Sequence, residues 1–208
     1  MSLAHAIDLQ HHDDTPVEDH IVRLGGSAWR DFERLLAIRG EKANPRLTYL
    51  DGALEIMSPS RTHETLKSLI SRLVEAYCLE AGIRFMPVGA WTLKDRLQEV
   101  GLEPDECYIF DAEETDRPHL AIEVVWTSGG IDKLEVYRRL RVQEVWYWRK
   151  GRIQVYVLAD DGYRPQAHSA RLPGLDLDLL TKFLDQPTAY DAIQGFRAHL
   201  DKQLRSLP

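Results

Sequence analysis

Two carboxylates stand where buried strands are expected, and their positions predict a cation-binding site. Glu123 lies in the segment Ala-Ile-Glu-Val-Val-Trp, residues 121–126, where all the other residues are apolar. Alternate side chains of a strand share a face, so both faces are apolar except at Glu123. Asp105 follows Pro104, which marks the beginning of a strand predicted over 106–110. An ionised carboxylate near a core is costly unless it is paired, so this pair predicts a site for a hard divalent cation such as magnesium.

Lys133 is the cationic side chain predicted at the same site. A helix is expected over 132–141, and its apolar stripe continues from Lys133 through Val136, Tyr137 and Leu140. A stripe of this kind faces the sheet, so the ammonium group is directed inward. The alternative is a buried aliphatic stem with its charged head in water. The two neighbouring carboxylates favour a functional role.

His63 and Glu55 are two further candidates. His63 shares the apolar stripe of a helix predicted over 61–81, although a lone helical histidine is more often a hydrogen-bonded core residue. Glu55 has apolar neighbours on both faces of its predicted strand, so it either joins the acidic site or pairs with an arginine. Glu64 lies off the stripe near the helix N-terminus, where the helix dipole favours a carboxylate, and a structural role is expected for it.

A series of short strands and helices must position these residues. Asp51-Gly52 is the strongest turn signal in the chain, and Ser27 and Ser60 are predicted to cap helices. The strands are predicted at 47–50, 53–57, 83–88, 91–94, 106–110, 119–126, 144–148 and 152–158, and a C-terminal helix from Thr188. This order predicts an α/β fold with a mixed sheet flanked by helices. Residues 1–20 are expected to form a disordered tail, and residues 21–208 a single domain.

Composition narrows the class of protein. The chain has 208 residues, of which 44% are hydrophobic, enough for one sizeable core. It contains no apolar run of the roughly 18 residues that a membrane span needs and no secretory signal pattern, so a cytoplasmic protein without membrane attachment is expected. The net charge of -7 counts against a protein that coats nucleic acid non-specifically. It is compatible with an enzyme whose metal ion offsets an acidic site.

Several short motifs in this order resemble the Uma-two family of restriction-endonuclease-like proteins, within the PD-(D/E)XK nuclease superfamily. They are the segment 49–59, His63, Pro104-Asp105, Ile122-Glu123-Val124, Lys133-Leu134-Glu135-Val136-Tyr137 and Val145-Trp146-Tyr147-Trp148. Each motif is weak alone, but six in the correct order are fairly specific. The resemblance covers residues 27 to 185.

The resemblance implies a restriction-endonuclease-like fold and hydrolysis of phosphodiester bonds in DNA. It implies Mg²⁺ or Mn²⁺ held by Asp105 and Glu123, helped by the backbone carbonyl of Val124, with Glu55 or His63 completing the metal shell or relaying a proton. The superfamily pattern places its lysine two residues after the glutamate. That position is Val125 here, and Lys133 stands in for it.

The main alternative is an inactive nuclease-like module that binds a partner or assembles a complex, with the site residues forming a structural ion-pair cluster. Two other groups of residues are ambiguous. Trp126, Trp146 and Trp148 could support a homodimer, although a core position is favoured. The arginines and lysine between Arg138 and Arg152 could contact phosphate, although a solvated face is favoured.

Overall fold

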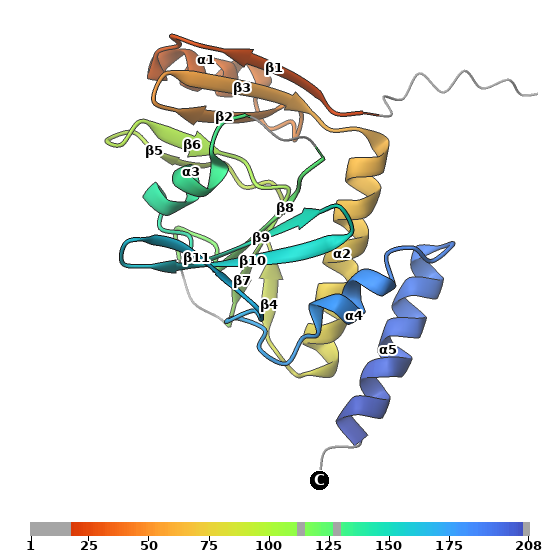
Figure 1. Cartoon of the computed structure of the whole chain (residues 1–208). Coiled ribbons are helices and arrows are strands. Elements are labelled where there is room, and N and C mark those ends of the chain that lie inside the picture. The colour runs from red at the N-terminus through yellow and green to blue at the C-terminus, as the bar shows by residue number, and fades with distance from the viewer. Residues whose placement is uncertain (1–17, 112–114, 127–129, 206–208) are drawn as a thin grey trace, which may run out of the picture.

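Five short strands form an antiparallel sheet at one end of the molecule (Figure 1). The computed structural model describes residues 18–111, 115–126 and 130–205; most of the predicted tail, residues 1–17, lies outside them. The sheet has the order β1-β3-β2-β6-β5. Its strands are β1 (His20–Leu24), β2 (Arg46–Leu50), β3 (Ala53–Ser58), β5 (Leu93–Asp95) and β6 (Val100–Leu102). The β2–β3 hairpin turns at Asp51 and Gly52, which both have positive φ, as the sequence predicts.

A second sheet contains six strands and is mixed. Its order is β11-β10-β9-β8-β7-β4, and only β8 and β9 run parallel. The strands are β4 (Phe85–Pro87), β7 (Glu106–Phe110), β8 (Leu120–Val124), β9 (Glu144–Arg149), β10 (Arg152–Ala159) and β11 (Gly162–Gln166). The predicted mixed α/β fold is confirmed, but the strands divide between two sheets.

The division arises because β6 pairs with β2 and lies against the first helix. A Cβ atom on Gly101 of β6 would lie 2.6 Å from the ring of Phe32, so only glycine allows this approach. Helix α1 (Trp29–Arg39) covers this sheet, and its Trp29 and Phe32 rings pack on Tyr49. The predicted cap at Ser27 is wrong. Ala28 is the N-cap residue, and its N–H donates to Asp31 Oδ2 at 2.8 Å.

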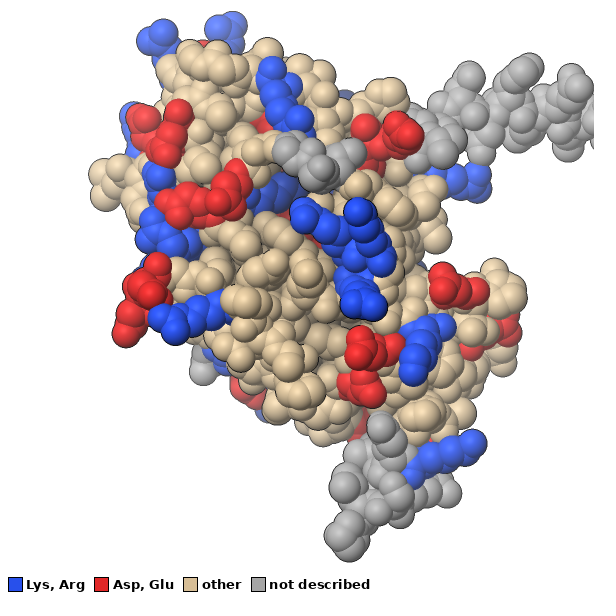
Figure 2. All heavy atoms as spheres, viewed as in Figure 1, with Lys and Arg blue, Asp and Glu red and all other residues tan. Residues whose placement is uncertain are grey.

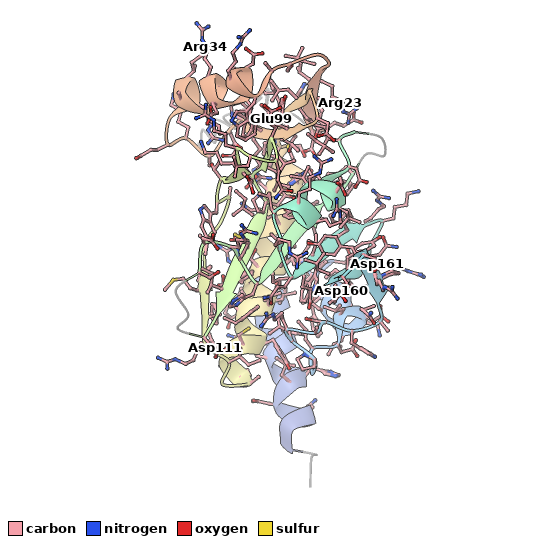
Figure 3. The ribbon with its side chains drawn as sticks, turned by 90° about the vertical axis from the view of Figure 1, so that its left-hand side faces the viewer. Arg23, Arg34, Glu99, Asp111, Asp160 and Asp161 are labelled. Atoms are coloured by element: carbon pink, nitrogen blue, oxygen red, sulfur yellow. The ribbon has the colours of Figure 1, made fainter. Side chains whose placement is uncertain are left out.

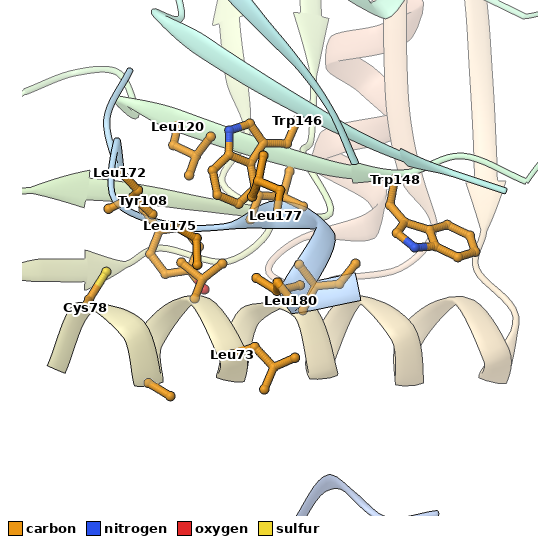
Figure 4. Packing of buried hydrophobic residues seen from close by; sticks show 14 of the residues in the cluster. Leu73, Cys78, Tyr108, Leu120, Trp146, Trp148, Leu172, Leu175, Leu177 and Leu180 are labelled. Atoms are coloured by element: carbon orange, nitrogen blue, oxygen red, sulfur yellow. The ribbon is translucent and has the colours of Figure 1, made fainter. Parts of the chain in front are cut away.

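The largest core lies between the six-stranded sheet and three helices. These are α2 (Arg61–Glu80), α4 (Leu177–Lys182), which the sequence analysis missed, and α5 (Ala189–Arg205). Leu73 of α2, Trp146 of β9 and Leu180 of α4 belong to this core. Figure 4 shows Trp146 and Leu180 on the side of α2 that faces the sheet and Leu73 on the other side of that helix. Complete burial of each such side chain contributes about 1.5–3 kcal/mol. No helix in the described part of the chain is both long and apolar enough to cross a membrane.

Helix α3 (Lys133–Arg139) lies between the two sheets and contacts β2, β6 and β11. It forms the crossover from β8 to β9, which a parallel strand pair requires. Its last residue, Arg139, donates to Asp51 at 2.6 and 2.7 Å and so ties the helix to the β2–β3 turn. Figure 3 shows how far the sheets extend: Arg34 and Arg23 lie at one end and Asp111 at the other. The first turn of α3 is therefore held at the junction of the sheets.

Candidate active site

Asp105 is fully buried at the edge of the six-stranded sheet. It immediately precedes β7, and the β7–β8 register pairs Glu106 with Ile122. Asp105 and Glu123 are therefore the next residues outward on the two strands. The backbone N–H of Val124 donates to Asp105 Oδ2 at 2.6 Å. The structure thus places the two predicted carboxylates on adjacent strands at the junction of the sheets.

Two side chains from other elements satisfy the Asp105 carboxylate. His63, in the first turn of α2, lies with Nε2 2.9 Å from Oδ2. Arg46, at the start of β2, donates to Oδ1 and also to Glu64 at 2.5 Å. Arg46 and His63 are 4% and 0% exposed, so the charge of Asp105 is compensated away from water. We call Asp19, Arg46, His63, Glu64 and Asp105 the Asp105 cluster.

Asp19 fixes the other side of the His63 ring. Its Oδ2 lies 2.8 Å from Nδ1 of His63, and its Oδ1 accepts the Ser60 N–H at 2.7 Å. Burial by itself would raise the pKa of Asp19, but the hydrogen bonds from His63 and Ser60 outweigh it and hold that pKa below its usual value. Ser60 is also the predicted cap of α2, since its Oγ accepts the His63 N–H at 3.1 Å. The ring is therefore held between two carboxylates.

Glu123 is satisfied from α3 rather than from α2. Lys133 Nζ donates to Glu123 Oε2 at 2.6 Å, and the Tyr137 hydroxyl donates to Oε1. Burial raises the pKa of Tyr137, and the negative charge of Glu123 raises it further, so the phenol stays protonated and remains a donor. Asp132 caps this helix by accepting the Glu135 N–H at 3.2 Å, which places Lys133 at its first position. We call Glu123, Lys133 and Tyr137 the Glu123 cluster.

Glu55, on β3, pairs with an arginine. Arg23 Nε of β1 donates to Glu55 Oε2 at 2.8 Å, which is one of the two outcomes that the sequence left open. The side chain of Arg23 is 47% exposed, whereas that of Glu55 is 8% exposed. A Cβ on Gly130 would lie 2.9 Å from both Arg23 Nη2 and Glu55 Oε2. The chain before α3 therefore runs close over this ion pair.

An open cleft of about 270 Å³ lies beside the Glu123 cluster. Its lining combines the ion pair Arg23–Glu55 with Lys133, Tyr147 and Arg149. Figure 2 shows Lys and Arg side chains gathered over the β9–β10 turn, at residues 149–152. Tyr147, whose pKa is raised by burial and by Glu123, remains a neutral donor. The cleft therefore places three cationic side chains, Arg23, Lys133 and Arg149, beside the carboxylates of Glu55 and Asp132.

The site offers the oxygen donors that a hard divalent cation prefers: Asp105, Glu123 and the carbonyl of Val124. The described residues contain no group of three or more His, Cys, Asp or Glu side chains that could hold a metal. A cation bound here would therefore complete its coordination with backbone oxygen and water, as Mg²⁺ commonly does. These oxygen donors are of the type that Mg²⁺ and Mn²⁺ bind. In this structure the charge of Glu123 is compensated by Lys133 and that of Asp105 by Arg46.

Three contributors were missed by the sequence analysis. Arg46 lies in a strand whose other residues are mainly apolar, and its partner Asp105 is 59 residues away, so no local pattern reveals the pair. Asp19 lay within the predicted tail. Tyr137 was placed on the buried stripe, but its hydroxyl was not recognised as a donor. A buried arginine in an apolar strand was the signal that could have identified Arg46, since such a charge requires a partner.

A protein-family model matches most of the chain. The family model Uma2, described as "Putative restriction endonuclease", matches residues 29–186, which is most of the chain and includes the site residues from Arg46 to Tyr137. No curated protein matches the chain.

Proposed function

Because the chain belongs to the Uma2 family of restriction-endonuclease-like proteins, we propose that it is a divalent-metal-dependent endonuclease that hydrolyses phosphodiester bonds in DNA. The observation that carries this proposal is the hydrogen bond from Lys133 to Glu123 at the margin of a cleft lined by cationic side chains. The pairing of β7 with β8 places Asp105 opposite Glu123, just beyond the last paired residues, Glu106 and Ile122. A lysine, two carboxylates and a cleft with cationic side chains are the parts that phosphodiester hydrolysis needs.

Each side chain has a distinct role in this proposal. Asp105 and Glu123, with the carbonyl of Val124, hold Mg²⁺ or Mn²⁺, which supplies Lewis-acid stabilisation of the phosphoryl oxygens when bound. Lys133 orients the attacking water and stabilises the negative charge that develops on the phosphate. Tyr137 holds Glu123 in place.

Glu55 is the better proton acceptor of the two predicted candidates. Its side chain lines the cleft, whereas both ring nitrogens of His63 face carboxylates and the residue is fully buried. His63 therefore acts by positioning Asp105. Arg23 and Arg149, which line the cleft, bind the phosphates on either side of the scissile bond.

Two active sites related by a twofold axis would cut both strands of a duplex in one encounter, so the active form in this proposal is a homodimer. Sedimentation at increasing protein concentration, with and without a DNA duplex, tests this part separately. A monomer that cuts both strands would contradict it.

An inactive binding or assembly module is the second candidate. The observation that favours it is that Arg46 and Lys133 already compensate Asp105 and Glu123, so the fold needs no metal for charge balance. Such a module would use the same cleft to bind an anionic partner without hydrolysing it.

Calorimetric titration of Mg²⁺ and Mn²⁺ distinguishes the two candidates. We expect binding by the wild type, loss of binding in Asp105→Ala/Glu123→Ala, and unchanged binding in Asp161→Asn, which alters an exposed carboxylate on the β10–β11 turn. Circular dichroism controls for folding, and nicking of supercoiled plasmid follows under the same conditions. A folded wild type that binds neither metal would contradict the nuclease and leave the binding module as the explanation.

A further inference from the structure

A second cavity, of about 410 Å³, opens between α2 and the end of the six-stranded sheet. Leu66 and Leu69 of α2 and the rings of Trp126 and Trp148 form its apolar walls, and Thr62 and Thr65 add hydroxyl groups. The lining also includes the charged side chains of Arg61 and Asp185. A cavity with apolar walls and a few polar groups suits a planar ring with polar edges. The proposed chemistry at Asp105 and Glu123 does not use this cavity.

Trp126 is the unusual residue of this cavity. Trp146 and Trp148 are buried, as the sequence predicts, but Trp126 is 45% exposed, so the core position favoured for it is wrong. Its ring contacts Trp148 edge to face, with centroids 5.0 Å apart and an interplanar angle of 66°. Such a contact fixes the ring of an exposed tryptophan. The result is an aromatic platform that no described side chain fully covers.

The cavity is adjacent to the candidate active site. Trp126 lines both the cleft that contains Lys133 and the second cavity, and it follows Glu123 by three residues. The β9–β10 turn also borders both spaces, because Arg149 lines the cleft and Gly151 lines the second cavity. A DNA backbone bound in the cleft would therefore place one of its nucleosides next to Trp126.

We propose that this cavity binds an unstacked nucleobase of the DNA substrate, with Trp126 as its stacking surface. The inference rests on the proposed function and adds to it the kind of DNA that is preferred: single-stranded, end-frayed or with a displaced base. Bases of every sequence have a π-face, so stacking on tryptophan gives affinity with little sequence preference. The threonine hydroxyls contact the polar edge of the base.

Binding of two fluorescent oligonucleotides by the full-length protein tests this proposal. One is a twelve-nucleotide oligothymidine, and the other is a strand of the same length and charge that consists of abasic sites. We expect the wild type to bind oligothymidine about tenfold more tightly, in line with the contribution of one stacked base. Fluorescence anisotropy, measured with Ca²⁺ in place of Mg²⁺, reports both affinities.

Variants locate the effect at Trp126. Trp126→Ala should remove the preference for oligothymidine and leave affinity for the abasic strand unchanged, and Trp126→Phe should retain part of it. Tyr190→Ala is the matched control, because Tyr190 is an aromatic residue of α5 that is 71% exposed. It should behave like the wild type.

The possible failures are separable. Equal affinity of the wild type for the two strands, together with cleavage of DNA, overturns the base pocket and leaves the nuclease intact. A preference for oligothymidine that survives in Trp126→Ala also overturns it. Absence of binding to either strand, with no cleavage, overturns the proposed function and the pocket together.

Discussion

Asp105 and Glu123 are equally buried, at 0% exposure, but their surroundings differ. Asp105 receives hydrogen bonds from a backbone N–H, an arginine and a histidine, which are all themselves buried. Glu123 receives two, from Tyr137 and from a lysine that is 17% exposed and lines the cleft. The Asp105 carboxylate and its three donors are closed to solvent, and in the Asp105 cluster the side chain of Glu64, 37% exposed, reaches the surface. The Glu123 cluster borders solvent through Lys133.

This difference indicates that the two clusters have different roles, one in holding the fold together and one in contacting a substrate. The Asp105 cluster joins β1, β2, α2 and the start of β7, so its bonds hold the two sheets together. The Glu123 cluster joins only β8 to α3, and its cation reaches the space where a substrate would enter. Changes of the residues that surround Asp105 should therefore act mainly on stability, and changes in the Glu123 cluster mainly on activity.

Replacement of Arg46 should have the largest effect. Arg46→Met leaves the buried Asp105 without its main cation, and loss of one partner of a buried ion pair typically costs about 3–5 kcal/mol. Urea unfolding monitored by circular dichroism measures the loss. The double variant Arg46→Met/Asp105→Asn, in which neither charge remains, should regain a large part of the lost free energy of unfolding. Equal instability of the single and double variants would show that packing of the arginine, and not the charge, is responsible.

Replacement of Lys133 should act on catalysis instead. Lys133→Met keeps the aliphatic stem but removes the charge that stabilises the transition state, so the turnover number should fall about a hundredfold or more. Plasmid nicking at saturating metal gives the rate. Lys150→Met removes an exposed lysine from the β9–β10 turn and should change the rate only a few fold. If Lys133→Met retained full activity, the division between the clusters would be wrong.

Replacement of Glu55 tests whether a cleft-lining residue outside the Glu123 cluster also contributes to activity. Glu55→Gln should lower the cleavage rate about a hundredfold, at the low end of the range for loss of a proton acceptor. Stability should change by less than about 1 kcal/mol, because the arginine partner is half exposed.

Gly130→Ala sharpens this test, since both charges remain but the new Cβ would meet Arg23 and Glu55 at 2.9 Å. A rate that falls in Glu55→Gln but not in Gly130→Ala assigns the effect to the carboxylate itself. A rate unchanged in both variants excludes Glu55 from the mechanism.

The surface pair on α3 should have the smallest effect. The hydrogen bond from Arg138, together with that from Arg139, lowers the pKa of Glu135 from 4.5 to about 2. A carboxyl group whose pKa is lower in the folded state stabilises the fold above pH 4.5, and this contribution disappears as the pH falls towards 2. Exposed pairs contribute less than about 1 kcal/mol. The difference in unfolding free energy between wild type and Glu135→Gln should therefore be small at pH 7 and smaller at pH 3; a constant difference would contradict the assignment.

The residues predicted from the sequence were those that interrupt an apolar pattern. The local sequence is sufficient to identify Glu123 in an apolar strand, Lys133 and His63 on apolar stripes, and Asp105 after a proline. The structure brings these four residues to the junction of the sheets. Arg46 and Asp19 could not be recognised, because a periodic pattern gives the face of an element but not its distant partner. The same limit applies to the sheets: β1, β6 and β11 are short, and their pairing depends on packing such as that of Gly101 on Phe32.

Helix α3 also determines when the site can exist during synthesis. Arg46, His63, Asp105 and Glu123 all precede it in the chain, and Asp51 and its partner Arg139 are 88 residues apart. Contacts of such long sequence separation form late, since a long loop must close first. The β8–β9 pair that supports Glu123 needs residues up to 148. A growing chain therefore carries both carboxylates on the ribosome before it can assemble the candidate site, which requires residues up to 148.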